Sequence, residues 1–239
     1  MPLPKIATPE YELVLPSTQK KITYRPFLVK EEKLLVLALE SENTKQITTA
    51  IKSVLKSCIL TRGIKVEKLP TFDIEYLFLN IRARSVGEEV EVNIVAPDDG
   101  ETSITVTIDL DEIQVHTNDN HTNKIKLDET LMMEMKYPSL EQFISNNFDF
   151  KGEVDMDKSF ELIASCIDKI YNEEDVWSTD DCTKKEVIDF LDQMNSNQFK
   201  EIEQFFDTMP KLSHTIEVTN PVTKVKSTIV LEGLSSFFA

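Results

Sequence analysis

The spacing of the apolar residues changes at Gly87, and this change restricts the fold more than any other feature of the chain. Residues 69–87 leave little polar face in their first half, which is typical of a buried helix. Thr71 would cap the start of that helix, and Gly87 would end it. After Gly87 the apolar residues occupy alternate positions, as in strands with one buried face: Val90, Val92, Ile94 and Ala96, then Ile104, Val106, Ile108 and Leu110. The turn at residues 97–100 predicts an antiparallel hairpin, and the whole pattern predicts an α+β fold.

The N-terminal part combines an extended segment with helices. Residues 1–28 form either a short hairpin or an arm, and residues 30–40 have a helical composition. Asn43 or Thr44 would then cap a second helix, and Gly63 is a plausible stop signal after it. The apolar stripe expected on this helix consists of Ile47, Ile51, Val54, Leu55 and Cys58.

The sequence after residue 110 predicts further short strands and an acidic helical segment. Residues 155–209 are expected to be helical, with Thr183 and Glu186 at capping-box spacing and a further cap near Ser196. Shorter elements are expected as strands at 113–115, 125–127 and 131–135, a helix capped by Ser139 that runs through Ile144, and a final hairpin of 214–219 and 228–231. The expected parts are therefore 1–87 (extended arm plus helices), 88–138 (antiparallel strands), 139–210 (acidic helices) and 211–239 (C-terminal hairpin), in one or two compact domains.

The acidic residues are concentrated in the back of the chain. The protein has 239 residues and a formal net charge of −16, of which residues 1–97 carry +2 and residues 98–239 carry −18. Residues 149–210 alone hold 17 acidic and 6 basic side chains. Such a chain repels nucleic acid and anionic membrane surfaces. The asymmetry indicates either two faces with different partners or an ordinary solvated helix surface.

The cysteines and the longest apolar run indicate a reducing, cytosolic setting. The N-terminus has no signal-peptide pattern, and the apolar run 34–39 is far shorter than the roughly 20 residues that span a bilayer. Three cysteines without CxxC spacing exclude a disulfide scaffold. Cys58 and Cys166 lie in apolar periodic segments and are expected to be buried small hydrophobes.

Catalytic signatures are missing, and we expect no enzyme activity, cofactor or metal. The five glycines are isolated, so there is no phosphate-binding loop. His116, Asp119 and His121 could hold a metal, but a solvated loop is the favoured interpretation. Carboxylates on both sides of Trp177 could serve a hydrolase, which is the distant alternative, although exposed surface charge is favoured there too.

A small set of residues is expected to bind partner proteins. Arg82 and Arg84 are two apart and cannot share one helix face. Ion pairs with acidic neighbours are favoured for them over nucleic-acid binding, and docking onto the acidic helices of another subunit is the third possibility. The aromatic C-terminus either folds into the core or forms a docking hook. The full candidate set is Tyr76, Arg82, Arg84, Trp177, Leu234, Phe237 and Phe238.

Four strings of the sequence together resemble the baseplate hub and hub-assembly proteins of T4-like bacteriophages. These strings are residues 24–33, 69–87, 136–138 and 233–238, and the resemblance runs from about residue 20 to the end. It implies a non-enzymatic viral tail protein that acts, like a chaperone, in virion assembly at the baseplate hub through protein-protein interaction. A permanent structural subunit of the baseplate is the alternative. The implied partners are other baseplate or hub proteins and a second copy of the chain, without nucleic acid, in the host cytoplasm or in the tail baseplate of the virion.

Overall fold

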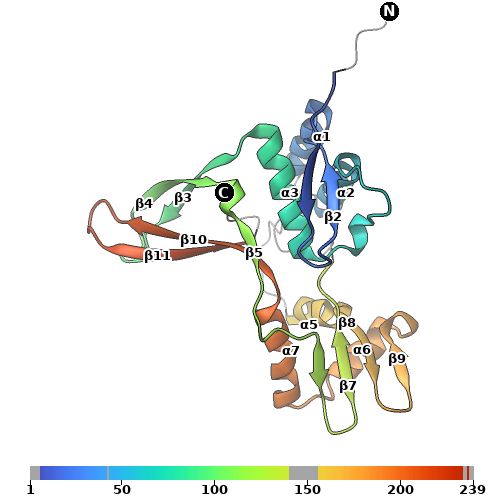
Figure 1. Ribbon diagram of the computed structural model, residues 1–239. Coiled ribbons are helices and arrows are strands. Elements are labelled where there is room, and N and C mark those ends of the chain that lie inside the picture. Colours follow the sequence, from blue (N-terminus) through green and yellow to red (C-terminus); the bar gives the residue numbers. More distant parts are fainter. Residues whose placement is uncertain (1–5, 42, 140–155, 234–235, 237–239) are drawn as a thin grey trace, which may run out of the picture.

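The computed structural model describes residues 6–41, 43–139, 156–233 and 236, and these residues form an α+β fold with two hydrophobic cores. Figure 1 shows a body with a projecting two-hairpin arm, and a lobe below them. The predicted fold class is confirmed. The helix predicted from Ser139 through Ile144 lies mostly outside the described residues.

The front of the body is a hairpin followed by two helices, so of the two predicted possibilities the hairpin is confirmed. Asn43 caps the second helix, since its side chain accepts hydrogen bonds from the backbone N–H groups of Lys45 and Gln46. This helix ends well before Gly63, because Ile59 bridges to Tyr24 and the chain becomes extended there. The elements are β1 (Tyr11–Val14), β2 (Lys21–Tyr24), α1 (Val29–Glu40) and α2 (Thr44–Cys58).

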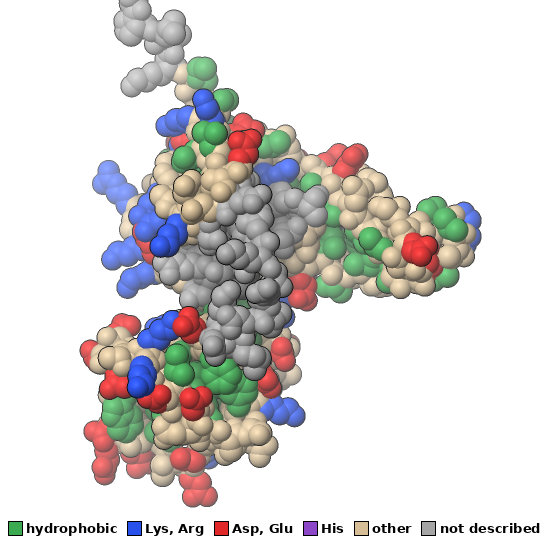
Figure 2. Space-filling view, turned by 180° about the vertical axis from the view of Figure 1, so that it is seen from behind, with side chains coloured by type: hydrophobic (Ala, Val, Ile, Leu, Met, Phe, Trp, Pro, Cys, Tyr) green, Lys and Arg blue, Asp and Glu red, His purple; other side chains and the backbone are tan. Residues whose placement is uncertain are grey.

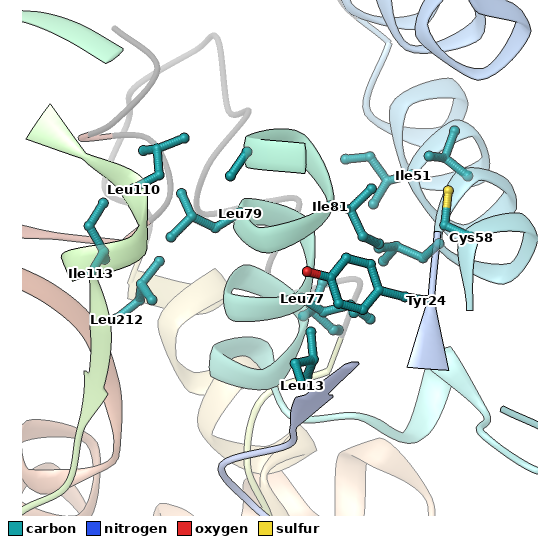
Figure 3. Packing of buried hydrophobic residues seen from close by; sticks show 14 of the residues in the cluster. Leu13, Tyr24, Ile51, Cys58, Leu77, Leu79, Ile81, Leu110, Ile113 and Leu212 are labelled. Carbon is teal, nitrogen blue, oxygen red and sulfur yellow. The ribbon is translucent and has the colours of Figure 1, made fainter. Parts of the chain in front are cut away.

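Helix α3 (Thr71–Val86) is the centre of the body. Figure 3 shows Leu79 on the side of Leu110 and Leu212, whereas Ile81 lies on the side of Tyr24. Thr71 is not the predicted cap, because Pro70 precedes the helix without a side-chain cap and the Thr71 N–H donates to the Pro138 carbonyl (3.0 Å). Gly87 ends the helix at φ 147°, as predicted. The prediction of a buried helix is confirmed by Phe72, Ile74, Leu77, Leu79 and Ile81.

The arm consists of two hairpins that are joined at their tips (Figure 1). Buried Asn220 donates to the carboxylates of Asp98 (3.1 Å) and Asp99 (2.8 Å), and it accepts from the Val222 N–H (2.8 Å). A third strand, β5, pairs with the base of the second hairpin. The elements are β3 (Glu89–Val95), β4 (Ser103–Asp109), η2 (Leu110–Glu112), β5 (Gln114–His116), β10 (Lys211–Thr219) and β11 (Lys226–Glu232), which confirms both predicted hairpins.

The lobe is inserted between β5 and β10, two strands that pair with each other. We call the described residues between them the acidic lobe, and all other described residues the body. A four-stranded antiparallel sheet of order β6-β7-β8-β9 packs with helices around the second core. Its elements are β6 (Lys124–Lys126), β7 (Met132–Met135), α5 (Met156–Ser165), β8 (Ile167–Tyr171), β9 (Val176–Ser178), η3 (Thr179–Asp181), α6 (Lys184–Leu191) and α7 (Ser196–Thr208).

The prediction that residues 155–209 are helical is wrong for residues 167–171 and 176–178, which form β8 and β9. Ile167 and Ile170 continue a helical stripe, but they also fit a strand that pairs with β7. Asn172 starts the turn between β8 and β9, because its side chain accepts from the N–H groups of Glu174 and Asp175. The capping box of Thr183 and Glu186 is confirmed, and the last cap is Asn195, next to the predicted Ser196.

Candidate functional site

Arg84 is engaged inside the body. Its guanidinium forms ion pairs with Glu88 and with Asp111 (2.9 Å), and it lies 5.4 Å from the centre of the Tyr11 ring. These contacts connect the C-terminal end of α3 to Asp111 of η2, to Glu88 just before β3, and to Tyr11 of β1. The prediction that Arg84 pairs with acidic neighbours is confirmed.

Arg82 and Tyr76 also belong to the half-buried part of α3. Burial lowers the pKa of Arg82, and the Tyr76 ring packs against the body core. The two arginines point to different environments, as their spacing predicts. This helix therefore serves mainly to assemble the body.

His121 lies in the acidic lobe, next to an aromatic joint between the lobe and the body. Its Nδ1 is 3.0 Å from the Thr208 hydroxyl and its Nε2 is 2.9 Å from the Tyr137 hydroxyl. Because Thr208 donates its proton to the Gln204 carbonyl (2.7 Å), it accepts from Nδ1–H, and Nε2 then accepts from Tyr137. A neutral imidazole fits both partners, and burial lowers the pKa of His121.

Aromatic rings extend this joint into both parts of the molecule. Phe72 of α3 meets Tyr137 edge-on, with ring centres 5.0 Å apart, and Tyr137 stacks on Phe205 of α7 at 5.7 Å. No group of three potential metal ligands occurs among the described residues, and His116 lies on β5, apart from the joint. The prediction of solvated side chains in this stretch is confirmed for His116 and Asp119, which are exposed, but not for His121, because its ring is partly buried against α7.

Trp177 borders an apolar groove in the acidic lobe. It lies on β9 directly opposite Ile170 on β8, so both side chains are on the sheet face that meets α6. The groove has a volume of about 340 Å³, which is in the range of ligand pockets, roughly 300–1,000 Å³. It is lined by Leu131, Ile170, Trp177, Thr179, Cys182, Glu186, Val187 and Phe190.

The groove is open to solvent at Trp177. The Trp177 side chain is 46% exposed, Ile170 and Phe190 are half-buried, and Val187 is buried. The sequence indicated Trp177 but missed Ile170 and Phe190, because the groove depends on the β8–β9 hairpin. Asn172, a turn-forming residue between two short apolar runs, was the available signal for that hairpin.

The carboxylate that lines the groove has a structural role. The Thr183 N–H and hydroxyl donate to Glu186 and lower the pKa of its carboxyl group. Two cysteines lie outside this groove. Burial raises the pKa of the Cys166 and Cys58 thiols to about 11, so both stay protonated. Both cysteines are buried, as predicted, whereas Cys182 is exposed.

A second exposed apolar surface lies on the body. Val29, Val36 and Leu37 of α1 are exposed, and Leu37 lines a groove of about 460 Å³ between α1 and α2. The nearby lysines of α2 pair with an acidic neighbour, since Lys52 and Lys56 contact Glu67 at 2.8 and 2.6 Å. The predicted C-terminal residues Leu234, Phe237 and Phe238 lie outside the described residues.

The charge on the two parts differs as the sequence indicates. Figure 2 shows blue Lys and Arg side chains over one side of the body and red Asp and Glu side chains over the acidic lobe. The acidic turn at Glu173–Asp175 and the pair Asp180 and Asp181 lie on either side of β9. The apolar groove therefore lies in acidic surroundings.

The described residues thus form an α+β body with an arm, and an acidic lobe that carries an exposed apolar groove. The chain matches the family described as T4 bacteriophage base plate protein over residues 8–239, and it belongs to this family. The resemblance to T4-like baseplate proteins is confirmed. No curated protein and no solved structure matches the chain. None of the helices in the described residues is long and apolar enough to cross a membrane.

Proposed function

We propose that this protein acts in assembly of the central hub of the phage baseplate, by binding other baseplate proteins and without catalysis. The observation that carries this proposal is the match to the T4 baseplate family over nearly the whole chain. The strings at 24–33 and 69–87 favour the hub within that family. Residues 69–87 include α3, the buried helix on which the body is built.

Two exposed apolar surfaces support a role in protein binding. One is the groove beside Trp177, and the other is the face of α1 that includes Leu37. Exposed apolar patches on soluble domains commonly mark interaction sites. Of the two, we assign the binding of hub proteins to the groove beside Trp177, because its acidic surroundings can select a partner by charge; this binding would take place in the host cytoplasm, before or while the hub is built.

Co-expression with the hub proteins of the same phage tests the proposal. We expect size-exclusion chromatography to show the chain eluting with at least one of them. Separate elution from every hub protein, at micromolar concentration, would contradict the proposal.

Mass spectrometry of purified virions separates the assembly factor from a permanent baseplate subunit. A transient factor is expected to be missing from intact particles and present in lysates that contain unfinished tails. Stoichiometric amounts in the virion would favour the permanent subunit.

A further inference from the structure

β9 forms an outer edge of the sheet, where the Ser178 carbonyl accepts a hydrogen bond from the Cys182 thiol (3.4 Å), a weak donor. β9 is the last strand of the sheet in the acidic lobe, and within the described ranges β8 is the strand that pairs with it. The edge of a sheet presents backbone N–H and C=O groups that another extended chain can bind. An incoming strand would therefore run along Val176–Ser178.

The groove lies within reach of such a strand. Trp177 projects from the middle of β9 into the apolar lining, with Ile170 opposite it and Phe190 on α6. Alternate side chains of an added strand lie on the same sheet face as Trp177. One large apolar side chain of the incoming segment would then enter the groove beside the indole.

The acidic residues around β9 favour basic residues in the incoming segment. Glu173, Glu174 and Asp175 precede the strand and are exposed, and Asp180 and Asp181 follow it. The one cation that contacts this rim in the described chain is Lys136, which lies 3.9 Å from Asp180. A segment with Lys or Arg on both sides of the apolar residue complements this surface, whereas an acidic segment is repelled.

We propose that β9 and the groove beside Trp177 bind an extended, basic segment of a partner protein, with one large apolar side chain seated in the groove. This inference rests on the proposed function and deepens it, because it states the chemistry of the partner. It does not require the partner to be a hub protein.

Fluorescence anisotropy with labelled peptides tests this inference on the full chain. The probe is a nine-residue peptide with a central Leu flanked by Lys and Arg, and the controls carry Glu for the basic residues or Ser for the Leu. We expect saturable binding of the basic Leu peptide, with at least about tenfold weaker binding of both controls. Emission of Trp177, the single tryptophan of the chain, should change with the same saturation curve.

Matched variants separate the contribution of the groove to peptide binding from that of the negative charge of the lobe. Trp177→Ala should weaken binding by about tenfold or more, since partly buried aromatic anchors dominate such interfaces. The triple change Glu173→Gln, Glu174→Gln and Asp175→Asn should weaken it by about fivefold at low salt and less at high salt. The control removes the same charge from α7 of the same lobe, with E201Q, E203Q and D207N, and should change binding little.

Equal binding of all three peptides, or no binding by a folded wild-type chain, would overturn the inference. Concentration-dependent dimerisation that Trp177→Ala abolishes, without peptide binding, would also overturn it, because the occupant would then be a second copy. The two proposals fail separately: peptide binding without any hub complex removes only the proposed function, and a hub complex formed by a chain that does not bind the basic Leu peptide removes only this inference.

Discussion

The body and the acidic lobe use their apolar residues in different ways. In the body, α3 is surrounded on two sides, and Leu77, Leu79 and Ile81 are almost completely buried (Figure 3). In the acidic lobe, a small sheet and short helices leave Trp177 and Phe190 only partly covered. This contrast supports the proposal that the body serves as the scaffold and that the acidic lobe, through the groove beside Trp177, binds the partner.

The charged residues of the body and of the acidic lobe also differ in how they are used. Arg84 and Glu31 of the body form internal ion pairs, the latter with Arg25 at 3.0 Å. In the lobe, the acidic turn around Glu174 is exposed to solvent. Charges that are used internally cannot select a partner, whereas an exposed cluster of one sign can.

Removal of a core side chain from α3 should have the largest effect on stability. Leu77→Ala deletes a fully buried side chain and should lower the free energy of unfolding by about 3 kcal/mol. Urea denaturation followed by circular dichroism measures this loss. A loss below about 1 kcal/mol would contradict the description of α3 as the centre of the body.

The link between the two hairpin tips should contribute less. Asn220→Ala removes the donor to Asp98 and Asp99 and leaves the Val222 N–H without its acceptor. We expect a loss of about 1–2 kcal/mol in urea denaturation. Thr215→Ala, an exposed change on the same strand, is the control, and equal losses in both variants would show that the tip contacts do not stabilise the arm.

Acid should destabilise the acidic lobe around His121. Because burial lowers the pKa of His121, the unfolded chain binds the proton more readily than the folded chain. The stability from this group is fully present above the ordinary pKa of about 6.5 and is lost as the pH falls below it. Wild-type chain should therefore lose more stability than His121→Gln between about pH 7.5 and about pH 5.5. Identical pH dependence in both chains would exclude His121 as the cause.

The smallest effect on stability is expected at the groove. Trp177 is 46% exposed, so Trp177→Ala should cost about 1 kcal/mol or less in urea denaturation. A loss near that of Leu77→Ala would mean that Trp177 is a core residue of the lobe, and the contrast between the two parts would then disappear.

Most of the body could be predicted from the sequence because its signals are local. The stripe of α2, the cap at Asn43 and the alternation after Gly87 depend on neighbouring residues, and all three are confirmed. Thr71 shows the limit of local reasoning. It is the first residue of α3, after Pro70, and its N–H donates to the carbonyl of Pro138, which is distant in sequence.

The lobe was harder to predict because its sheet joins distant segments. Ile167 and Ile170 have a spacing that suits a helix, and the strand forms because β7 provides a pairing edge. The groove was hard to predict for the same reason, because Trp177 lies near Phe190 only when β8 and β9 have formed. His121 was misjudged for the same reason, because its partners are Tyr137 and Thr208.

The most direct test of the division between scaffold and binding lobe is a comparison of two surface variants in one experiment. Wild-type chain, Trp177→Ala and Leu37→Ser are co-expressed with the hub proteins and analysed by size-exclusion chromatography. The account predicts that Trp177→Ala stays folded but loses the complex, while Leu37→Ser on α1 of the body keeps it. A complex that survives Trp177→Ala and is lost with Leu37→Ser would contradict the account.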